Sequence, residues 1–221
     1  MDDPAVRSTS HERRARPTRP APTDVPIHPL LAGRWSPRGL DPDRSVDPAD
    51  VRALLEAARW APSNGNVQPW RFVVADDEDP AARERLRDCL HTGNAWAHRA
   101  PVLLLSLAAR EFPAREDKPS RENPYAWHDV GAATLAAAIE ATSRGLGLHP
   151  MAGFDRAAAA EAVGAPEGLE PVALLALGHP AADPRSVPDE LVERDARPRT
   201  RTGVDSFVWR GHVGGPAPNG S

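Results

Sequence analysis

Residues 61–70 read APSNGNVQPW and join an amphipathic helical pattern to an apolar strand pattern. The two prolines of this loop fix two φ angles and favour extended conformations in the residues before them. The loop therefore presents four polar side chains at low entropic cost, namely Ser63, Asn64, Asn66 and Gln68. Side-chain amides carry both donors and acceptors, which suits the edge of a planar heterocycle. A plain turn between a helix and a strand accounts for the same composition, because Pro, Ser, Asn and Gly are common turn residues.

The sequence around this loop predicts alternating helices and strands. Asp47 can cap a helix whose first position is Pro48 and whose first turn holds Asp50. Apolar patterns and glycine stops predict three further helices, over residues 80–91, 127–144 and 155–163, and three strands, over 71–75, 102–107 and 172–177. Interleaved helices and strands with long connections indicate a sheet covered by helices on both faces, and they leave the strand pairing open.

Composition divides the 221 residues into three parts. Residues 1–28 carry five arginines and almost no large apolar side chains, which predicts a disordered tail. Residues 29–212 are long enough for one domain with a substantial core, and their charged, Pro-rich stretch 109–124 is expected to be a loop. Residues 213–221 are expected to form a flexible C-terminal tail.

Charge and cysteine content narrow the classes of partner. A net charge of −4 and a pI of about 6.1 give no reason to expect nucleic acid or an anionic membrane surface. Cys89 is the only cysteine, so neither an intrachain disulfide nor a Cys-based metal cluster can form. The sequence holds no long apolar run and no secretory signal, so we expect a soluble, cytoplasmic protein. His128 and Asp129 are expected to cap a helix rather than bind a metal.

Two short segments are rich in arginine. Residues 34–38 read RWSPR, and residues 197–201 read RPRTR. Guanidinium groups bind phosphate oxygens in a bidentate manner, and a serine between two of them adds a neutral donor. Although the segments are far apart in sequence, both can converge on one phosphate. Solvated arginines without a ligand remain the alternative.

Together these segments resemble the nitroreductase-like family of FMN-dependent oxidoreductases over residues 30–212. Five motifs occur in the family's order: RWSPR at 34–38, the loop at 61–70, a long helix from DVGA at 129–132 to GLGL at 145–148, PMAGFD at 150–155, and the late basic pair. The resemblance implies an α+β, three-layer fold with a central mixed or antiparallel sheet. It also implies a homodimer with two sites at the subunit interface. A monomer that uses the alanine-rich helix as its core remains the alternative.

The resemblance further implies which residues hold FMN. In the family, the first basic segment contacts the phosphate and ribityl chain, the loop reaches the flavin of the neighbouring subunit, the backbone near 150–153 passes the flavin N5 and O4 edge, and the late pair closes over the phosphate. The residues so implied are Arg34, Trp35, Ser36, Arg38, Pro62, Ser63, Asn64, Asn66, Gln68, Pro150, Met151, Ala152, Gly153, Arg199 and Arg201. Asn94 is a further candidate from a looser alignment.

The function implied is that of an FMN-dependent NAD(P)H oxidoreductase. It reduces nitroaromatic, quinone or related acceptors in a ping-pong cycle in which hydride passes through flavin N5, and it requires no catalytic side chain and no metal. The alternatives are a specialised flavoenzyme of the same fold, such as a reductive dehalogenase or a desaturase, and a non-catalytic FMN-binding or storage protein. The sequence does not distinguish NADH from NADPH.

Overall fold

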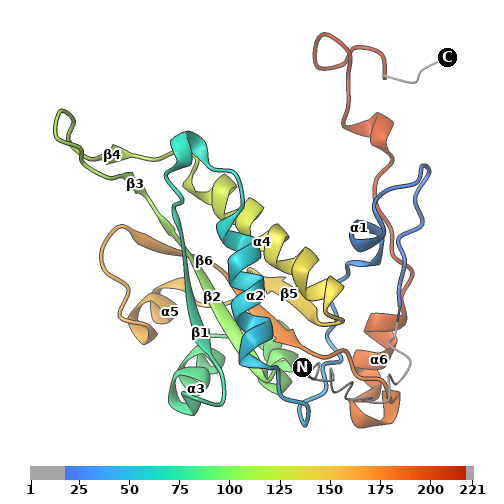
Figure 1. Ribbon diagram of the computed structural model, residues 1–221. Coiled ribbons are helices and arrows are strands. Elements are labelled where there is room, and N and C mark those ends of the chain that lie inside the picture. The colour runs from blue at the N-terminus through green and yellow to red at the C-terminus, as the bar shows by residue number, and fades with distance from the viewer. Residues whose placement is uncertain (1–17, 218–221) are drawn as a thin grey trace, which may run out of the picture.

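The computed structural model describes residues 18–217 and is built around a four-stranded sheet (Figure 1). The strand order is β1-β2-β6-β5, and each neighbouring pair is antiparallel. The strands are β1 (Trp70–Ala75), β2 (Val102–Ala109), β6 (Leu169–Gly178) and β5 (Gly147–Met151). The pairing that the sequence left open is therefore antiparallel throughout this sheet.

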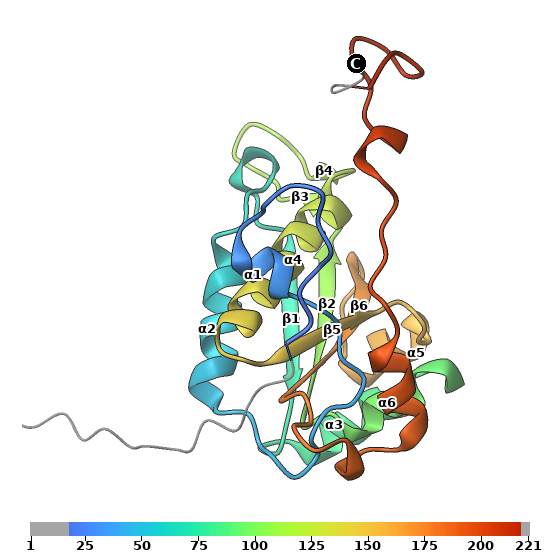
Figure 2. The ribbon, with the colours of Figure 1, turned by 90° about the vertical axis from the view of Figure 1, so that its right-hand side faces the viewer.

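Helices cover both faces of the sheet (Figures 1 and 2). One face carries α2 (Pro48–Arg59) and α4 (Ala126–Ser143), and the other carries α3 (Pro80–Asp88), η2 (Thr92–Arg99) and α5 (Arg156–Ala162). Along β2, successive side chains alternate between the two hydrophobic cores, so that Leu104 packs on one face and Leu103 and Leu105 on the other. The predicted three-layer α+β fold is confirmed.

The local signals that predicted the helices operate as expected. The Asp47 side chain accepts a hydrogen bond from the Ala49 N–H, and Pro48 fills the first position of α2. The Asp155 side chain caps α5 by accepting from the Ala158 N–H. After α4 the chain turns at Gly145, whose φ of 72° is readily adopted only by glycine.

In three regions the chain forms helices or strands that the sequence did not predict. β5 contains a proline, Pro150, which lacks a ladder donor; the strand pairs only with β6 and lies at the edge of the sheet, where proline is tolerated. The stretch 109–124 contains a short hairpin of β3 (Glu111–Phe112) and β4 (Arg121–Glu122). The Pro-rich region after residue 180 contains α6 (Asp189–Ala196) and η3 (Pro184–Ser186).

Residues 18–28 and α1 (Pro29–Gly33) lie beside the C-terminal segment that contains η4 (Val204–Ser206). The Arg19 guanidinium donates to the Arg197 carbonyl at 2.6 Å. The disordered tail predicted for 1–28 falls partly on residues 1–17, outside the described part of the chain, and the predicted C-terminal tail falls partly on 218–221, also outside it. Among the described helices, none has the length and apolarity needed to cross a bilayer.

The single cysteine lies directly after α3 on the inner side of the fold. Cys89 is buried, and its thiol donates to the Arg85 carbonyl at 3.2 Å. Burial, followed by the nearby Asp155 and Asp88 carboxylates, raises the pKa of the thiol. Cys89 therefore packs in the core.

Candidate functional site

A cavity of about 320 Å³ brings the two arginine-rich segments together. We call it the arginine cavity. Its walls include Trp35, Ser36, His149 and Asp195. Seven arginines line it, from the N-terminal segment, the RWSPR motif, α6 and the C-terminal segment: Arg19, Arg34, Arg38, Arg194, Arg197, Arg199 and Arg201. The convergence that the sequence allowed is therefore present within a single chain.

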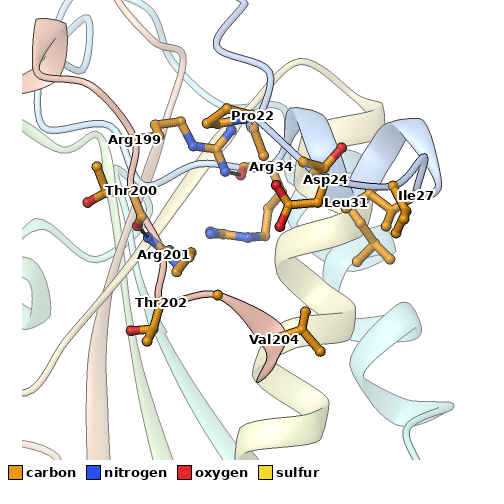
Figure 3. Close-up of a pocket in the computed structure, with 14 residues that line it drawn as sticks. Pro22, Asp24, Ile27, Leu31, Arg34, Arg199, Thr200, Arg201, Thr202 and Val204 are labelled. Carbon is orange, nitrogen blue, oxygen red and sulfur yellow. Dashed lines mark hydrogen bonds between the residues drawn. The ribbon is translucent and has the colours of Figure 1, made fainter. Parts of the chain in front are cut away.

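Arg34 and Arg201 also line a second cavity, of about 560 Å³, and the close-up of that cavity in Figure 3 shows the Arg34 side chain extending toward Arg201. An Nη of Arg34 also donates to the Ser36 Oγ at 3.3 Å. Burial, followed by repulsion from Arg201, lowers the pKa of Arg34. Among the described residues, neither arginine forms an ion pair with a carboxylate. An anion placed between them would relieve the repulsion.

Arg38 is held through its backbone, and its guanidinium lies over the Trp96 ring, 6.0 Å from the ring centroid. The Asp195 carboxylate accepts the backbone N–H of Arg38 at 2.9 Å and that of Gly39 at 2.8 Å. The Nε of Arg38 is buried, and no described residue accepts a hydrogen bond from it. A buried guanidinium donor without an acceptor is costly. Because Arg38 lines the arginine cavity, a phosphate group there would offer its guanidinium an acceptor.

His149 on β5 fixes the carbonyl in the middle of the RWSPR motif. Its Nδ1 lies 3.0 Å from the Pro37 oxygen, and its ring centroid lies 4.6 Å from that of Trp96. Burial, opposed by the hydrogen bond to Pro37, lowers the pKa of His149 from 6.5 to about 4. A Cβ at Gly147 would lie 2.2 Å from the Pro37 Cγ, so β5 approaches the motif closely only because residue 147 is glycine. β5 thus sets the position of the motif.

Arg199 joins the two ends of the chain. Its guanidinium donates to the Ala32 carbonyl at 2.8 Å, to the Arg34 carbonyl at 2.8 Å, and to the Arg19 carbonyl. These bonds occupy both of its Nη atoms with backbone acceptors. Its predicted contact with a phosphate remains a prediction, and the structure gives it a second role as a link between the terminal segments.

The segment 150–153 follows directly from His149. Pro150 and Ala152 are exposed, whereas Met151 is buried. The Gly153 carbonyl accepts from the Asn94 side chain at 2.9 Å, and a Cβ at Gly153 would lie 2.7 Å from the same Asn94 nitrogen. The structure therefore places the looser candidate, Asn94, against this segment.

The loop at 61–70, which we call the amide loop, contains η1 (Asn64–Asn66) and is bonded to itself. The Ser63 hydroxyl accepts the Gln68 N–H at 3.0 Å, and the Gln68 side chain donates to the Asn66 side chain at 3.1 Å. Asn66 and Gln68 have φ values of 56° and 52°, in the left-handed region. Glutamine adopts this region at a cost, and such strain is typical of functional loops.

Asp129 anchors the amide loop to α4. Its carboxylate is buried and accepts the Asn64 N–H at 3.0 Å. The other oxygen lies 2.9 Å from the His128 Nδ1. The predicted helix-capping role of this pair is wrong, since the cap residue Tyr125 makes no side-chain capping bond and Asp129 serves a neighbouring loop instead. The sequence signal that could have revealed this role is the position of Asp129, an acidic residue on the inward face of an alanine-rich helix.

In the described part of the chain, no group of three or more His, Cys, Asp or Glu residues is placed to hold a metal.

The amide loop and the arginine cavity lie at opposite ends of α4. Asp129, which holds the loop, is in the first turn of the helix, whereas a Cβ at Gly33, next to Arg34, would contact Thr142 in the last turn at 3.9 Å. In Figure 1 the loop lies above the start of α4, and α1 and α6 lie toward its end. Eighteen helical residues span about 27 Å. One chain therefore brings the two arginine-rich segments together at the cavity, next to the strand that leads into 150–153, and separates the amide loop from them.

Residues 31–179, more than half of the chain, match the nitroreductase family. The chain belongs to the nitroreductase family. An uncharacterised 15.4 kDa protein of Mycolicibacterium smegmatis is 41% identical over 131 residues, which cover 59% of this chain and 84% of that protein. An NADH dehydrogenase of Thermus thermophilus is 32% identical over 160 residues, which cover 60% and 77% of the two chains.

Solved structures agree with this assignment. The structure of an oxidoreductase containing FMN superposes on this nitroreductase with a TM-score of 0.80 at 30% identity, covering 88% of this chain and 96% of that one. A protein of Desulfovibrio desulfuricans solved in complex with FMN gives a TM-score of 0.61 at 27% identity, covering 83% and 96%. The family and the enzyme class predicted from the sequence, an oxidoreductase of the nitroreductase type, are confirmed.

Proposed function

We propose that this protein binds FMN and carries reducing equivalents from NADH or NADPH to a nitroaromatic, quinone or related organic acceptor. The observation that carries the proposal is the arginine cavity, in which Arg34 and Arg201 repel each other and the buried Nε of Arg38 lacks an acceptor. Relatives that contain FMN and relatives named as NAD(P)H-using enzymes support it.

The side chains around the cavity have distinct tasks in this proposal. Arg34, Arg38 and the Ser36 hydroxyl bind the phosphate, and Arg201 adds positive charge at the mouth of the cavity. His149 and Asp195 hold the backbone of the motif so that these donors are preorganised. FMN, when bound, supplies a ring that takes up two electrons and one proton as hydride and returns them to the acceptor. No side chain of the protein then needs to react.

The polar edge of the bound ring requires groups that one chain does not bring to the arginine cavity. The backbone at Ala152 and Gly153 lies on the cavity's own side, because it continues β5 beyond His149. Ser63, Asn64, Asn66 and Gln68 lie at the far end of α4. We therefore place them in the site of a second copy, in a homodimer with two interfacial sites.

Exposed apolar side chains support a homodimer. On α4, Leu135 is 48% exposed and lies one turn beyond the exposed Gly131. In the C-terminal segment, Phe207 is 58% and Trp209 is 42% exposed. Large apolar side chains that stand free of the chain's own core are typical of a surface that another subunit covers. Size-exclusion chromatography with light scattering measures the expected dimer mass directly.

The visible spectrum of the purified protein tests the proposal. We expect a yellow protein that NADH or NADPH bleaches without oxygen and that nitrofurazone or a quinone recolours. A yellow protein that neither nucleotide bleaches would support an FMN storage role instead. Bleaching without turnover of these acceptors would favour a specialised flavoenzyme of the same fold. Colourless protein that takes up no added FMN would contradict all three functions, because each of them requires bound FMN.

A further inference from the structure

A third cavity adjoins the amide loop on the side away from the arginine cavity. It has a volume of about 220 Å³ and lies between the loop, at Asn64, Gly65 and Val67, and the β3–β4 hairpin. In Figure 1 this hairpin projects from the upper left of the sheet, beyond the helical layers. We call this cavity the hairpin pocket.

The basic and acidic side chains of the hairpin are distributed unequally between its two faces. Residues 110–122 contain four basic and four acidic side chains, so the segment is neutral overall. The pocket wall nevertheless includes three of the bases, Arg115, Lys118 and Arg121, and none of the acids. Strand pairing explains part of the sorting, because Phe112 stands opposite Arg121 and both line the pocket, whereas Glu111 stands opposite Glu122 on the other face. The pocket is therefore cationic although its sequence is balanced.

The three cations are available to a ligand. Arg115 and Lys118 exchange two backbone hydrogen bonds, at 2.8 and 3.1 Å, so both side chains leave the same tight turn. Neither forms an ion pair with a described residue. The Arg121 guanidinium stacks over the Phe112 ring at 4.3 Å. Glu122 does not line the pocket and forms an ion pair with Arg110 at 3.0 Å.

We propose that the hairpin pocket binds a phosphate group of the nicotinamide nucleotide that reduces the enzyme. This inference rests on the proposed function, because the loop that forms one wall of the pocket is the loop placed at the flavin of a second subunit. A whole small-molecule site usually occupies roughly 300–1,000 Å³. The pocket is smaller and fits one anionic group of a larger ligand. That group is either the 2′-phosphate, which only NADPH carries, or the pyrophosphate, which both nucleotides carry.

The double variant Arg115→Gln, Lys118→Gln tests this inference in the FMN-loaded enzyme. Its kcat/KM is measured with NADPH, with NADH and with 1-benzyl-1,4-dihydronicotinamide, a hydride donor that lacks phosphate. We expect kcat/KM with NADPH to fall about tenfold or more, because hydrogen bonds to charged groups contribute most at such a site. With the phosphate-free donor, kcat/KM and FMN content should be unchanged. The matched control is Arg52→Gln, Arg185→Gln, two exposed arginines outside both cavities.

The outcomes separate the possible sources of the phosphate. A loss with both nucleotides assigns the pocket to the pyrophosphate, and a loss with NADPH alone assigns it to the 2′-phosphate. Unchanged kcat/KM for both nucleotides in a yellow, active enzyme overturns the inference and leaves the proposed function standing. An equal loss with all three donors overturns it as well, because it reveals a structural role for the hairpin. If wild-type protein takes up no FMN, the proposed function fails and this inference fails with it.

Discussion

The arginine cavity and the amide loop differ in how complete each is within one chain. Four separate segments of the chain meet at the arginine cavity, and Asp195, His149 and Arg199 fix its backbone. The amide loop is satisfied by its own hydrogen bonds and by Asp129, and it lies at the opposite end of α4, a helix about 27 Å long. One region gathers positive charge from several parts of the chain, whereas the other is held by bonds within the loop and by one distant carboxylate. The difference supports the proposal that two copies of the chain complete each site.

Removing the side chains that we propose bind the phosphate should have the largest effect. In the variant Arg34→Gln, Arg38→Gln, two charge-assisted contacts are lost, and we expect FMN to bind about 100-fold more weakly or worse. Equilibrium dialysis or quenching of flavin fluorescence measures the dissociation constant. Arg199 is left intact, because its bonds to the carbonyls of Ala32 and Arg34 would confuse loss of phosphate contact with loss of structure. Affinity equal to that of wild type would refute the assigned role of the RWSPR motif.

Mixing two inactive variants tests whether the loop acts on a second subunit. One partner carries Arg34→Gln, Arg38→Gln, and the other carries Asn64→Ala, Asn66→Leu. After random exchange of subunits, half of the dimers are mixed and one of their two sites has both intact halves, so about a quarter of wild-type activity should return. Steady-state reduction of a quinone by NADPH measures this recovery. If the loop served the flavin of its own chain, mixing would restore no activity.

The third expected effect is the pH dependence of folding stability, which reports on the arginine cavity through His149. Burial lowers the pKa of His149 to about 4, from 6.5, so the unfolded chain binds the additional proton between these pH values. The contribution of His149 to the free energy of unfolding is therefore fully present above pH 6.5. It is lost as the pH falls toward 4, by up to about 3 kcal/mol. Arg34 and Arg38 oppose the charged form and Asp195 favours it.

The variant His149→Asn isolates this contribution. Urea denaturation at pH 7.0 and at pH 4.5 should show a smaller loss of stability on acidification than in wild type. Since carboxylates elsewhere titrate in the same range, the informative quantity is the difference between the two proteins. An identical loss in both would show that His149 does not sense this pH range.

The smallest expected effect concerns backbone strain in the amide loop. Gln68 has a φ of 52°, so Gln68→Gly should raise folding stability by about 1 kcal/mol while FMN binding weakens. The matched substitution Gly65→Ala should instead lower folding stability, because Gly65 has a φ of 58°, which alanine adopts only at a cost. A Cβ there would meet no atom within 4 Å, so the effect reports backbone strain alone. Thermal unfolding followed by circular dichroism measures both. A destabilised Gln68→Gly protein with unaltered flavin affinity would instead support a purely structural turn.

Much of the core was predictable because it depends on local patterns. The helix that begins at Pro48 and the leucine-rich run of β2 carry their signals within a few residues. β5 was missed since Gly147 and Pro150 oppose strand formation, and the sheet edge that tolerates them is a tertiary property. The β3–β4 hairpin was missed because each strand is two residues long.

The candidate site was predictable by residue type but not by arrangement. The sequence motifs identified Arg34, Ser36 and Arg38 as candidates, and all three line the arginine cavity. Long-range contacts decided the rest: Asp195 reaches the motif from 157 positions away, and Asp129 lies 65 positions from the loop that it holds. No local spacing signals such partners.

The buried position of Cys89 makes the protein convenient for spectroscopic labelling. Because the only thiol is shielded and its pKa is raised, maleimide dyes should leave the native chain unmodified at neutral pH. A thiol introduced on the hairpin by Ser120→Cys would then carry the dye at one known position. Its emission could follow nucleotide arrival on the millisecond timescale, independently of the flavin's own colour.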